Sequence, residues 1–132
     1  MNIPFVDLKA QYLSIKKDID AAIQGVIDNT NFIGGKAIKD FETKFAALNG
    51  AKHVIGVGNG TDAIYIVMRM LGIGAGDEVI TTAASWISTS ETISQTGAKP
   101  IFVDIDPSTN TIDPRLIEAK KTSRTKAIIP VH

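Results

Sequence analysis

The 132-residue sequence contains no cysteine and only two histidines, His53 and His132. Disulfides, thiolate catalysis and zinc–thiolate centres are therefore excluded, and two histidines so far apart do not indicate a metal site. An excess of charge of one sign is also lacking, because 14 basic residues balance 14 acidic ones. The sequence thus gives no electrostatic reason to expect a nucleic-acid or membrane partner.

Long hydrophobic runs are missing as well. No stretch approaches the roughly 20 apolar residues that a membrane helix needs. The N-terminus, MNIPFVDLKAQY, lacks the basic start and apolar core of a signal peptide. We therefore expect a cytoplasmic protein. Its length corresponds to about one domain, and 44% hydrophobic residues suffice for one core.

Two amphipathic helices are predicted in the first 50 residues. Apolar residues spaced by three and four run from Leu8 to Asn29, and Asp7 can cap this helix. A second apolar stripe runs from Ile38 to Leu48, and Gly50 follows where a C-terminal glycine cap belongs.

After residue 50, short apolar strands alternate with helices. We predict strands at 53–57, 78–82, 100–103 and 126–131, and helices at 61–71, 85–96 and 113–121. Asp113 caps the last helix and Pro114 takes its first position. This order is typical of an α/β fold with a parallel sheet, and the nearly continuous apolar strands indicate that both faces are covered.

Ligands in parallel sheets bind beyond the carboxyl ends of the strands. Here those ends are residues 58–62, 82–86 and 104–106, together with His132. A parallel sheet normally continues from a strand end into a loop and a helix. Because the chain stops at His132 on a strand end, we expect the sequence to be truncated.

The first candidate site lies in Gly56–Ile64, GVGNGTDAI, where an apolar run turns on glycines into a helix start. Backbone N–H groups point outward together there and suit an anion, most often a phosphate. In this interpretation the N–H groups of Gly60, Thr61 and Asp62, with the Thr61 hydroxyl, bind a phosphate. The alternative is that Thr61 or Asp62 is a plain helix cap, and the pattern alone does not separate the two.

A dinucleotide site is only weakly indicated by the same segment. Gly56 and Gly58 begin the pattern G-x-G-x-x-G, but its third glycine falls at Thr61. The Gly-Lys-Ser/Thr sequence of a P-loop is absent.

The second candidate is Trp86, the only tryptophan, which follows the strand predicted at 78–82. A flat aromatic ring at a sheet end can stack on a planar heterocycle. On position alone, an ordinary buried tryptophan is the favoured alternative. Asp104 and Asp106, with Pro107 behind them, are interpreted first as turn residues and second as an acid–base pair.

Six segments follow one another along the chain: IPFVDLKAQY, Phe41-Glu42 with Phe45-Ala46, GVGNGTDAI, LGIGAGDEVITT, SETISQTGAKPIFVDIDPSTNTIDP and TKAIIPVH. Taken in this order, they resemble the DegT/DnrJ/EryC1/StrS family of sugar aminotransferases, which use pyridoxal 5'-phosphate. The resemblance covers essentially the whole chain. It implies the large domain of the aspartate-aminotransferase type (fold type I of pyridoxal-phosphate enzymes), truncated, with residues 1–50 as an N-terminal helical segment and 51–132 as the first part of the cofactor-binding domain.

The resemblance also implies roles for individual residues. The turn at Gly60, Thr61 and Asp62 would bind the cofactor phosphate, and Trp86 would stack on the pyridine ring, where many relatives have Phe or Tyr. Residues 82–85, Thr-Ala-Ala-Ser, depart from the family's common Pro-Ser-Phe-Thr, which bears on the shape of this loop. The Schiff-base lysine and the aspartate that pairs with the pyridine nitrogen are expected beyond His132. No catalytic residue is therefore assigned here, and the 132 residues alone are expected to be inactive.

The implied function is that of the N-terminal part of an aminotransferase. It would move an amino group from an amino acid, with glutamate as the expected donor, to a nucleotide-linked keto sugar, and the complete protein would be a homodimer. Two alternatives stay open. One is a non-catalytic regulatory or binding homologue, which would lack the lysine, and the other is a free-standing nucleotide-binding α/β module.

Overall fold

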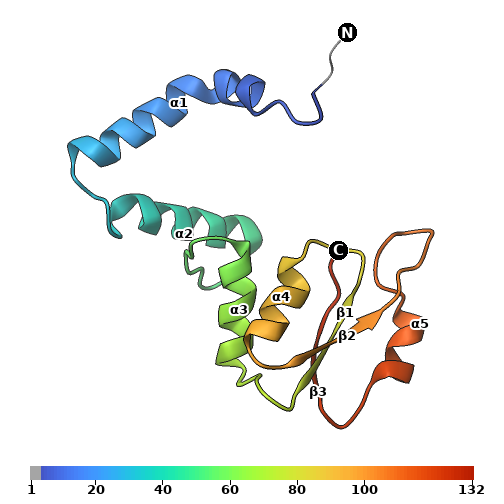
Figure 1. Ribbon diagram of the computed structural model, residues 1–132. Coiled ribbons are helices and arrows are strands. Elements are labelled where there is room, and N and C mark those ends of the chain that lie inside the picture. The colour runs from blue at the N-terminus through green and yellow to red at the C-terminus, as the bar shows by residue number, and fades with distance from the viewer. Residues whose placement is uncertain (1–3) are drawn as a thin grey trace. The chain divides into compact units, whose positions relative to one another are not determined.

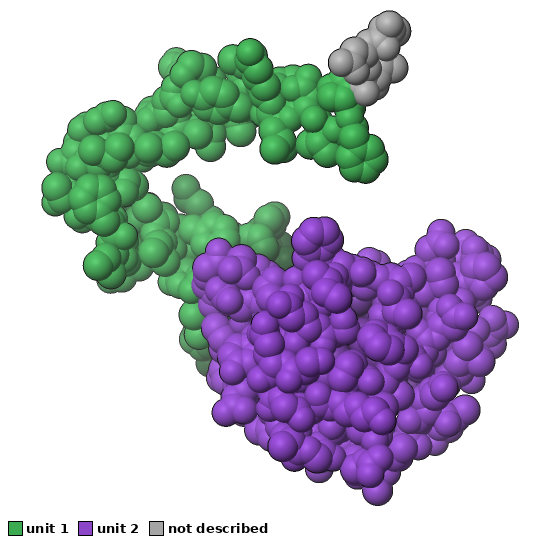
Figure 2. Space-filling model, in the orientation of Figure 1, with its two compact units in different colours: residues 1–56 green, residues 57–132 purple. Residues whose placement is uncertain are grey.

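The computed structural model describes residues 4–132, and the chain falls into two compact units, residues 1–56 and 57–132 (Figure 2). Residues 1–3 lie outside the described residues. They begin the N-terminal segment that lacks the features of a signal peptide and that resembles the start of the family. Within residues 4–132, no helix is both long enough and apolar enough to span a bilayer.

The first unit consists of two helices, α1 (Leu8–Asp28) and α2 (Lys36–Asn49). The carboxylate of Asp7 accepts a hydrogen bond of 2.9 Å from the N–H of Ala10, which confirms the predicted cap. Gly50 ends α2 in the left-handed region at φ 63°, as predicted for a glycine cap. Neither helix contains a buried residue, so the apolar stripes that predicted them remain exposed within this unit.

The strand predicted at 53–57 is wrong, because these residues form no strand. The N–H of Gly56 donates instead to Oε1 of Glu42 at 2.8 Å. Among residues 4–132 no other strand pairs with this segment. An extended apolar run becomes part of a sheet only where a neighbouring strand completes its hydrogen-bond ladder.

The second unit is built on a three-stranded parallel sheet with the order β2-β1-β3, which confirms the predicted parallel pairing. The strands are β1 (Glu78–Thr82), β2 (Lys99–Val103) and β3 (Thr125–Ile129). The helices are α3 (Gly60–Met70), α4 (Ser88–Gln95) and the short α5 (Pro114–Ile117), which continues as the 3-10 helix η1 (Glu118–Lys120).

Helices cover both faces of this sheet, as the apolar strands predicted. Figure 1 shows α3 and α4 on one side of the strands and α5 on the other. Two separate hydrophobic clusters fill the two sides. The first joins Met68, Ile73, Val79, Ile93 and Ala98, and the second joins Ile80, Val103 and Ile112. Consecutive residues of β1 thus face opposite clusters, as the pleat of a strand requires.

A register shift separates the first two pairs between β1 and β3. Glu78 pairs with Thr125, whereas Val79 pairs with Ala127, so Lys126 is the extra residue of a bulge. Lys126 is exposed, while Ala127 and Ile129 pack against the cluster under α3 and α4.

A buried carboxylate lies at the first residue of β1. Glu78 is only 3% exposed, and its Oε1 accepts hydrogen bonds from Arg124 Nη2 at 2.5 Å and Nε at 3.0 Å. Its Oε2 accepts one from the Thr122 hydroxyl at 2.6 Å. The hydrogen bond from Thr122, followed by those from Arg124, holds the pKa of Glu78 below its ordinary value of 4.5. The pair ties the start of the central strand to the turn before β3.

We predict that Glu78→Gln lowers the stability of the protein at neutral pH, because it leaves the Arg124 guanidinium without its counter-charge. A depressed pKa in the folded state means that the stabilisation is complete above about pH 4.5 and is lost as the pH falls through the lower folded-state value. Urea unfolding midpoints measured at a series of pH values should therefore converge for wild type and variant at acid pH.

Glu118→Gln is the matched control, because Glu118 pairs with Lys121 at the surface and is 79% exposed. An exposed pair of this kind contributes little, so its midpoints should follow those of wild type. Equal midpoints of wild type and Glu78→Gln at neutral pH would contradict the prediction.

Candidate functional site

The start of α3 is capped by Asn59. Its Oδ1 accepts a hydrogen bond of 2.9 Å from the N–H of Asp62, and its Nδ2 donates to Asp62 Oδ2 at 3.0 Å. The helix has a side-chain cap, but the predicted residues, Thr61 or Asp62, are wrong, because the cap is Asn59. Asn59 followed three positions later by an acidic residue is a recognisable cap pattern, and it could have been found in the sequence.

Two backbone N–H groups remain available at this helix start. Asp62 uses its N–H for Asn59, and Ala63 donates to the Asn59 carbonyl at 3.2 Å. Gly60 and Thr61 have no acceptor for their N–H groups among residues 4–132. Unpaired N–H groups at a helix N-terminus carry the positive end of the helix dipole, which favours an anion.

The Thr61 hydroxyl lies 2.7 Å from the hydroxyl of Ser88, the first residue of α4. This contact brings the starts of α3 and α4 together, 27 positions apart in sequence. Ser88 is 7% exposed. Ser88 is not marked by any local pattern in the sequence, and only the tertiary packing brings it to Thr61.

Trp86 stands two residues before Ser88, on the segment between β1 and α4. Its side chain is 78% exposed, so it does not belong to either hydrophobic cluster of this unit. Its carbonyl accepts a hydrogen bond of 3.3 Å from the N–H of Thr89. The structure therefore brings the segment of Trp86 and the start of α3 to one place through the pair of Ser88 and Thr61.

Asp106 opens a turn, as first interpreted, because its carbonyl accepts the N–H groups of Thr109 and Asn110. Asp104 lies instead beside an isolated antiparallel bridge between Ile105 and Ile112. The carboxylate of Asp106 accepts hydrogen bonds from the Ser108 N–H at 2.8 Å and hydroxyl at 2.6 Å, and these lower the pKa of Asp106. The Asp104 carbonyl accepts the N–H of Asp113 at 2.9 Å, and the Asp113 carboxylate caps α5 as predicted.

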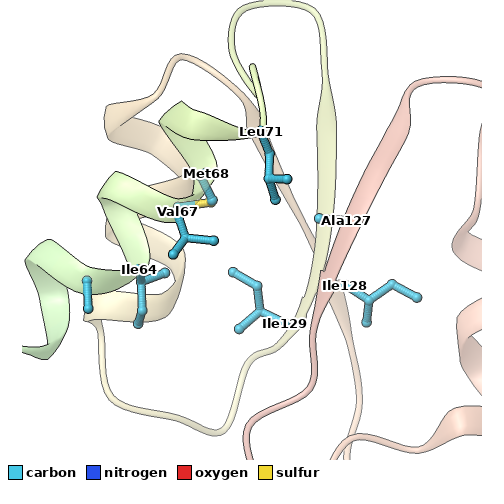
Figure 3. Close-up of a pocket in the computed structure, with 8 residues that line it drawn as sticks. Ile64, Val67, Met68, Leu71, Ala127, Ile128 and Ile129 are labelled. Atoms are coloured by element: carbon cyan, nitrogen blue, oxygen red, sulfur yellow. The ribbon is translucent and has the colours of Figure 1, made fainter. Parts of the chain in front are cut away.

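A hydrophobic groove of about 380 Å³ runs between α3 and the edge strand β3 (Figure 3). Ile129 points toward the side chains of α3, whereas Ile128 points to the other side of its strand. The groove is lined by Ala63, Ile64, Val67, Met68, Leu71, Ala127, Ile128 and Ile129. These side chains offer nothing to orient a polar ligand, so the groove is not the candidate site.

The candidate site is therefore the set of two N–H groups and two hydroxyls at Gly60, Thr61 and Ser88, with Trp86 next to it in the chain. Backbone N–H groups and hydroxyls at a helix start suit the oxygens of a phosphate ester. Within the described residues, no three histidine or carboxylate side chains are arranged to hold a metal ion.

We predict different effects for two alanine substitutions in the glycine turn. A Cβ at Gly58 would lie 2.8 Å from Asp62 Oδ2 and would displace this flexible carboxylate from Asn59, which offsets the stabilisation that a Gly→Ala substitution otherwise gives. A Cβ at Gly60, in the first turn of α3, meets nothing within 4 Å. Gly60→Ala should stabilise the helix by about 0.5–1 kcal/mol.

Urea unfolding of the two variants beside wild type measures both effects, and each variant serves as the control for the other. Equal changes in the two unfolding midpoints would contradict the described turn geometry.

Comparison with known proteins identifies the family. The model of the DegT/DnrJ/EryC1/StrS aminotransferase family matches residues 13–132. The chain therefore belongs to this family, and the resemblance noted in the sequence is confirmed.

Two relatives and one solved structure illustrate the match. A UDP-2-acetamido-2-deoxy-3-oxo-D-glucuronate aminotransferase of Pseudomonas aeruginosa is 50% identical over 129 residues, which are 98% of this chain and 36% of that protein. A protein of Geobacillus stearothermophilus named pleiotropic regulatory protein is 50% identical over 132 residues, or 100% of this chain and 36% of that protein. The structure of NtdA from Bacillus subtilis with bound cofactor PMP has a TM-score of 0.94 at 36% identity and covers 99% of this chain and 30% of that one.

These matches confirm the predicted α/β fold of the aminotransferase type. The chain spans about a third of the length of the relatives that it matches.

Proposed function

We propose that this chain is the N-terminal part of a pyridoxal-phosphate-dependent aminotransferase that acts on a nucleotide-linked keto sugar. The observation that carries the proposal is the phosphate-suited start of α3, joined through Ser88 to the segment of Trp86, in a chain of an aminotransferase family. The B. subtilis structure with bound PMP supports the cofactor, since PMP is the amine form of pyridoxal phosphate.

The residues of the site fit the phosphate end of this cofactor. In the proposed arrangement the N–H groups of Gly60 and Thr61 donate to phosphate oxygens, and the Thr61 hydroxyl adds a third donor. Asp62 was predicted to donate as well, but its N–H is held by Asn59 in this structure. Its proposed part is to keep the turn in shape through its carboxylate, which Asn59 directs back over Gly58.

Trp86 is proposed to cover the pyridine ring of the cofactor. The exposed indole has a free face for stacking, because it is not packed into a cluster of this unit. Bound pyridoxal phosphate supplies the electron sink that amino-group transfer requires. The part played by this chain is to anchor the phosphate and orient the ring.

The substrates are proposed from the relatives. The name of the P. aeruginosa protein describes an aminotransferase of a UDP-linked 3-oxo sugar. We infer the same class of substrate here, with glutamate as the amino donor and a homodimer as the working form. The lysine that bonds to the cofactor and the aspartate that pairs with the pyridine nitrogen are proposed to lie in the sequence downstream of His132. The cytoplasmic location stays a prediction of the sequence.

A regulatory role is the second candidate, and the name of the G. stearothermophilus protein favours it. The two candidates differ in the downstream lysine. An aminotransferase needs that lysine as nucleophile and proton carrier, whereas a regulator can lack it.

We predict that the complete protein transfers an amino group from glutamate to a UDP- or dTDP-linked keto sugar when pyridoxal phosphate is present, and that the 132-residue chain alone gives no turnover. The chain alone has no assigned lysine to hold the cofactor aldehyde. Mass spectrometry of the sugar product and 2-oxoglutarate formation measure the reaction.

Replacement of the downstream lysine by alanine in the complete protein is the control and should abolish product. Turnover by the 132 residues alone would refute the assignment of chemistry to the downstream part. Cofactor binding without turnover on any keto sugar would favour the regulatory candidate.

We predict that Trp86→Ala in the complete protein weakens the retention of pyridoxal phosphate by about 1–3 kcal/mol, the size of base–aromatic stacking. Equilibrium dialysis followed by the cofactor absorbance measures it. Trp86→Phe keeps a stacking face and should retain most of the affinity. Equal affinities of wild type and Trp86→Ala would show that the indole does not cover the ring.

A further inference from the structure

The hydroxyls of Thr61 and Ser88, which meet between α3 and α4, share one hydrogen bond and leave one O–H group without an acceptor. Thr61 and Ser88 lie 2.7 Å apart, and either oxygen can be the donor. Neither hydroxyl has a second partner among the side-chain and backbone atoms of residues 4–132. Two hydroxyls carry two protons but share one hydrogen bond, so one O–H remains to donate elsewhere.

Burial decides which O–H remains. If Thr61 donated to Ser88, the proton of Ser88 would have no acceptor, and Ser88 is only 7% exposed. A buried donor without an acceptor costs free energy. If Ser88 donates to Thr61, the buried hydroxyl is satisfied and the spare proton belongs to Thr61, whose side chain is the more accessible of the two. The second direction is therefore the stable one.

The position of Ser88 is itself fixed by buried contacts. Its carbonyl accepts a hydrogen bond of 2.7 Å from the hydroxyl of Thr92, a residue with 0% exposure in the next turn of α4. Thr92 and Ile93 of this helix lie buried beside the sheet. The backbone of Ser88 is thus held in place, and burial restricts the room available to its side chain.

We propose that Ser88 is a positioning residue of the phosphate subsite: its hydroxyl donates to Thr61 Oγ1 and thereby directs the Thr61 O–H to a phosphate oxygen. This inference rests on the proposed function, because it takes the cofactor phosphate as the acceptor. Ser88 does not touch the phosphate in this arrangement. Because Ser88 donates to Thr61, the Thr61 O–H cannot donate to Ser88 and is free to donate to the phosphate when the cofactor binds.

The test compares two ligands in the complete protein. Pyridoxal phosphate carries the phosphate, whereas pyridoxal has the same ring and aldehyde without it. Ser88→Ala should weaken the binding of pyridoxal phosphate about 3- to 10-fold, the size of one hydrogen bond, and leave the binding of pyridoxal unchanged. Ser88→Cys, which keeps the size of the side chain with a weaker donor, should give the same selectivity and covers the case that Ser88→Ala does not fold.

A double-mutant cycle with Thr61→Val adds a readout that a structural role would not give. Because Ser88 acts through Thr61, Ser88→Ala should cause no further loss in the Thr61→Val protein. Ser94→Ala is the matched control, since it removes an exposed hydroxyl of the same helix, one that donates to the Ser90 carbonyl at 3.1 Å. It should leave both ligands unaffected.

Equal losses for both ligands, or additive losses in the cycle, would overturn the positioning role while leaving the proposed function intact. Failure of the wild-type complete protein to bind pyridoxal phosphate would overturn the proposed function and this inference with it.

Discussion

Burial of β1 on both faces is the constraint on which the second unit depends. All five residues of this strand are buried, and its neighbours β2 and β3 complete both hydrogen-bond ladders. Val79 and Ile80 direct hydrocarbon to opposite faces, so each face needs its own helical cover. The helices α3 and α4 cover one face together, and this shared packing makes the contact between Thr61 and Ser88 possible.

Local chemistry was strong enough to predict several elements from the sequence. The strand Glu78–Thr82 has the predicted bounds, and the caps at Asp7, Gly50 and Asp113 are where they were expected. A cap is decided by a side chain and the backbone within three residues, so the sequence contains the whole cause. The strand at 53–57 failed for the opposite reason, since pairing depends on another strand far away in sequence.

The candidate site also combines features that local sequence determines with features that only tertiary packing determines. The glycine turn and Trp86 could be proposed from their positions after apolar runs, and the exposed state of Trp86 is now known, although position alone favoured a buried one. Asn59 is a local signal of the same kind, because its cap bond reaches only to Asp62. Ser88 could not be predicted, because its partner Thr61 is 27 residues away and only the packing of two helices on one sheet face brings them together.

The helix α4 begins three residues later than the sequence predicts. Its buried face carries hydroxyls, and these bond to the helix itself: Thr92 to the Ser88 carbonyl and Thr96 to the Ile93 carbonyl, each at 2.7 Å. Such bonds let threonine replace hydrocarbon beside a core without leaving a polar atom unsatisfied. A helix buried in this way has only a weak apolar period, so periodicity locates its ends poorly.

The bulge before Ala127 decides which side chains of β3 face α3. Side chains alternate between the faces of a strand, so one residue more or less changes which face every later side chain takes. Because of the extra Lys126, Ala127 and Ile129 share a face with Val79. Regular pairing of Lys126 with Val79 would instead turn Lys126 and Ile128 toward α3. The bulge therefore keeps the lysine at the surface and places two apolar side chains of the edge strand against the cluster.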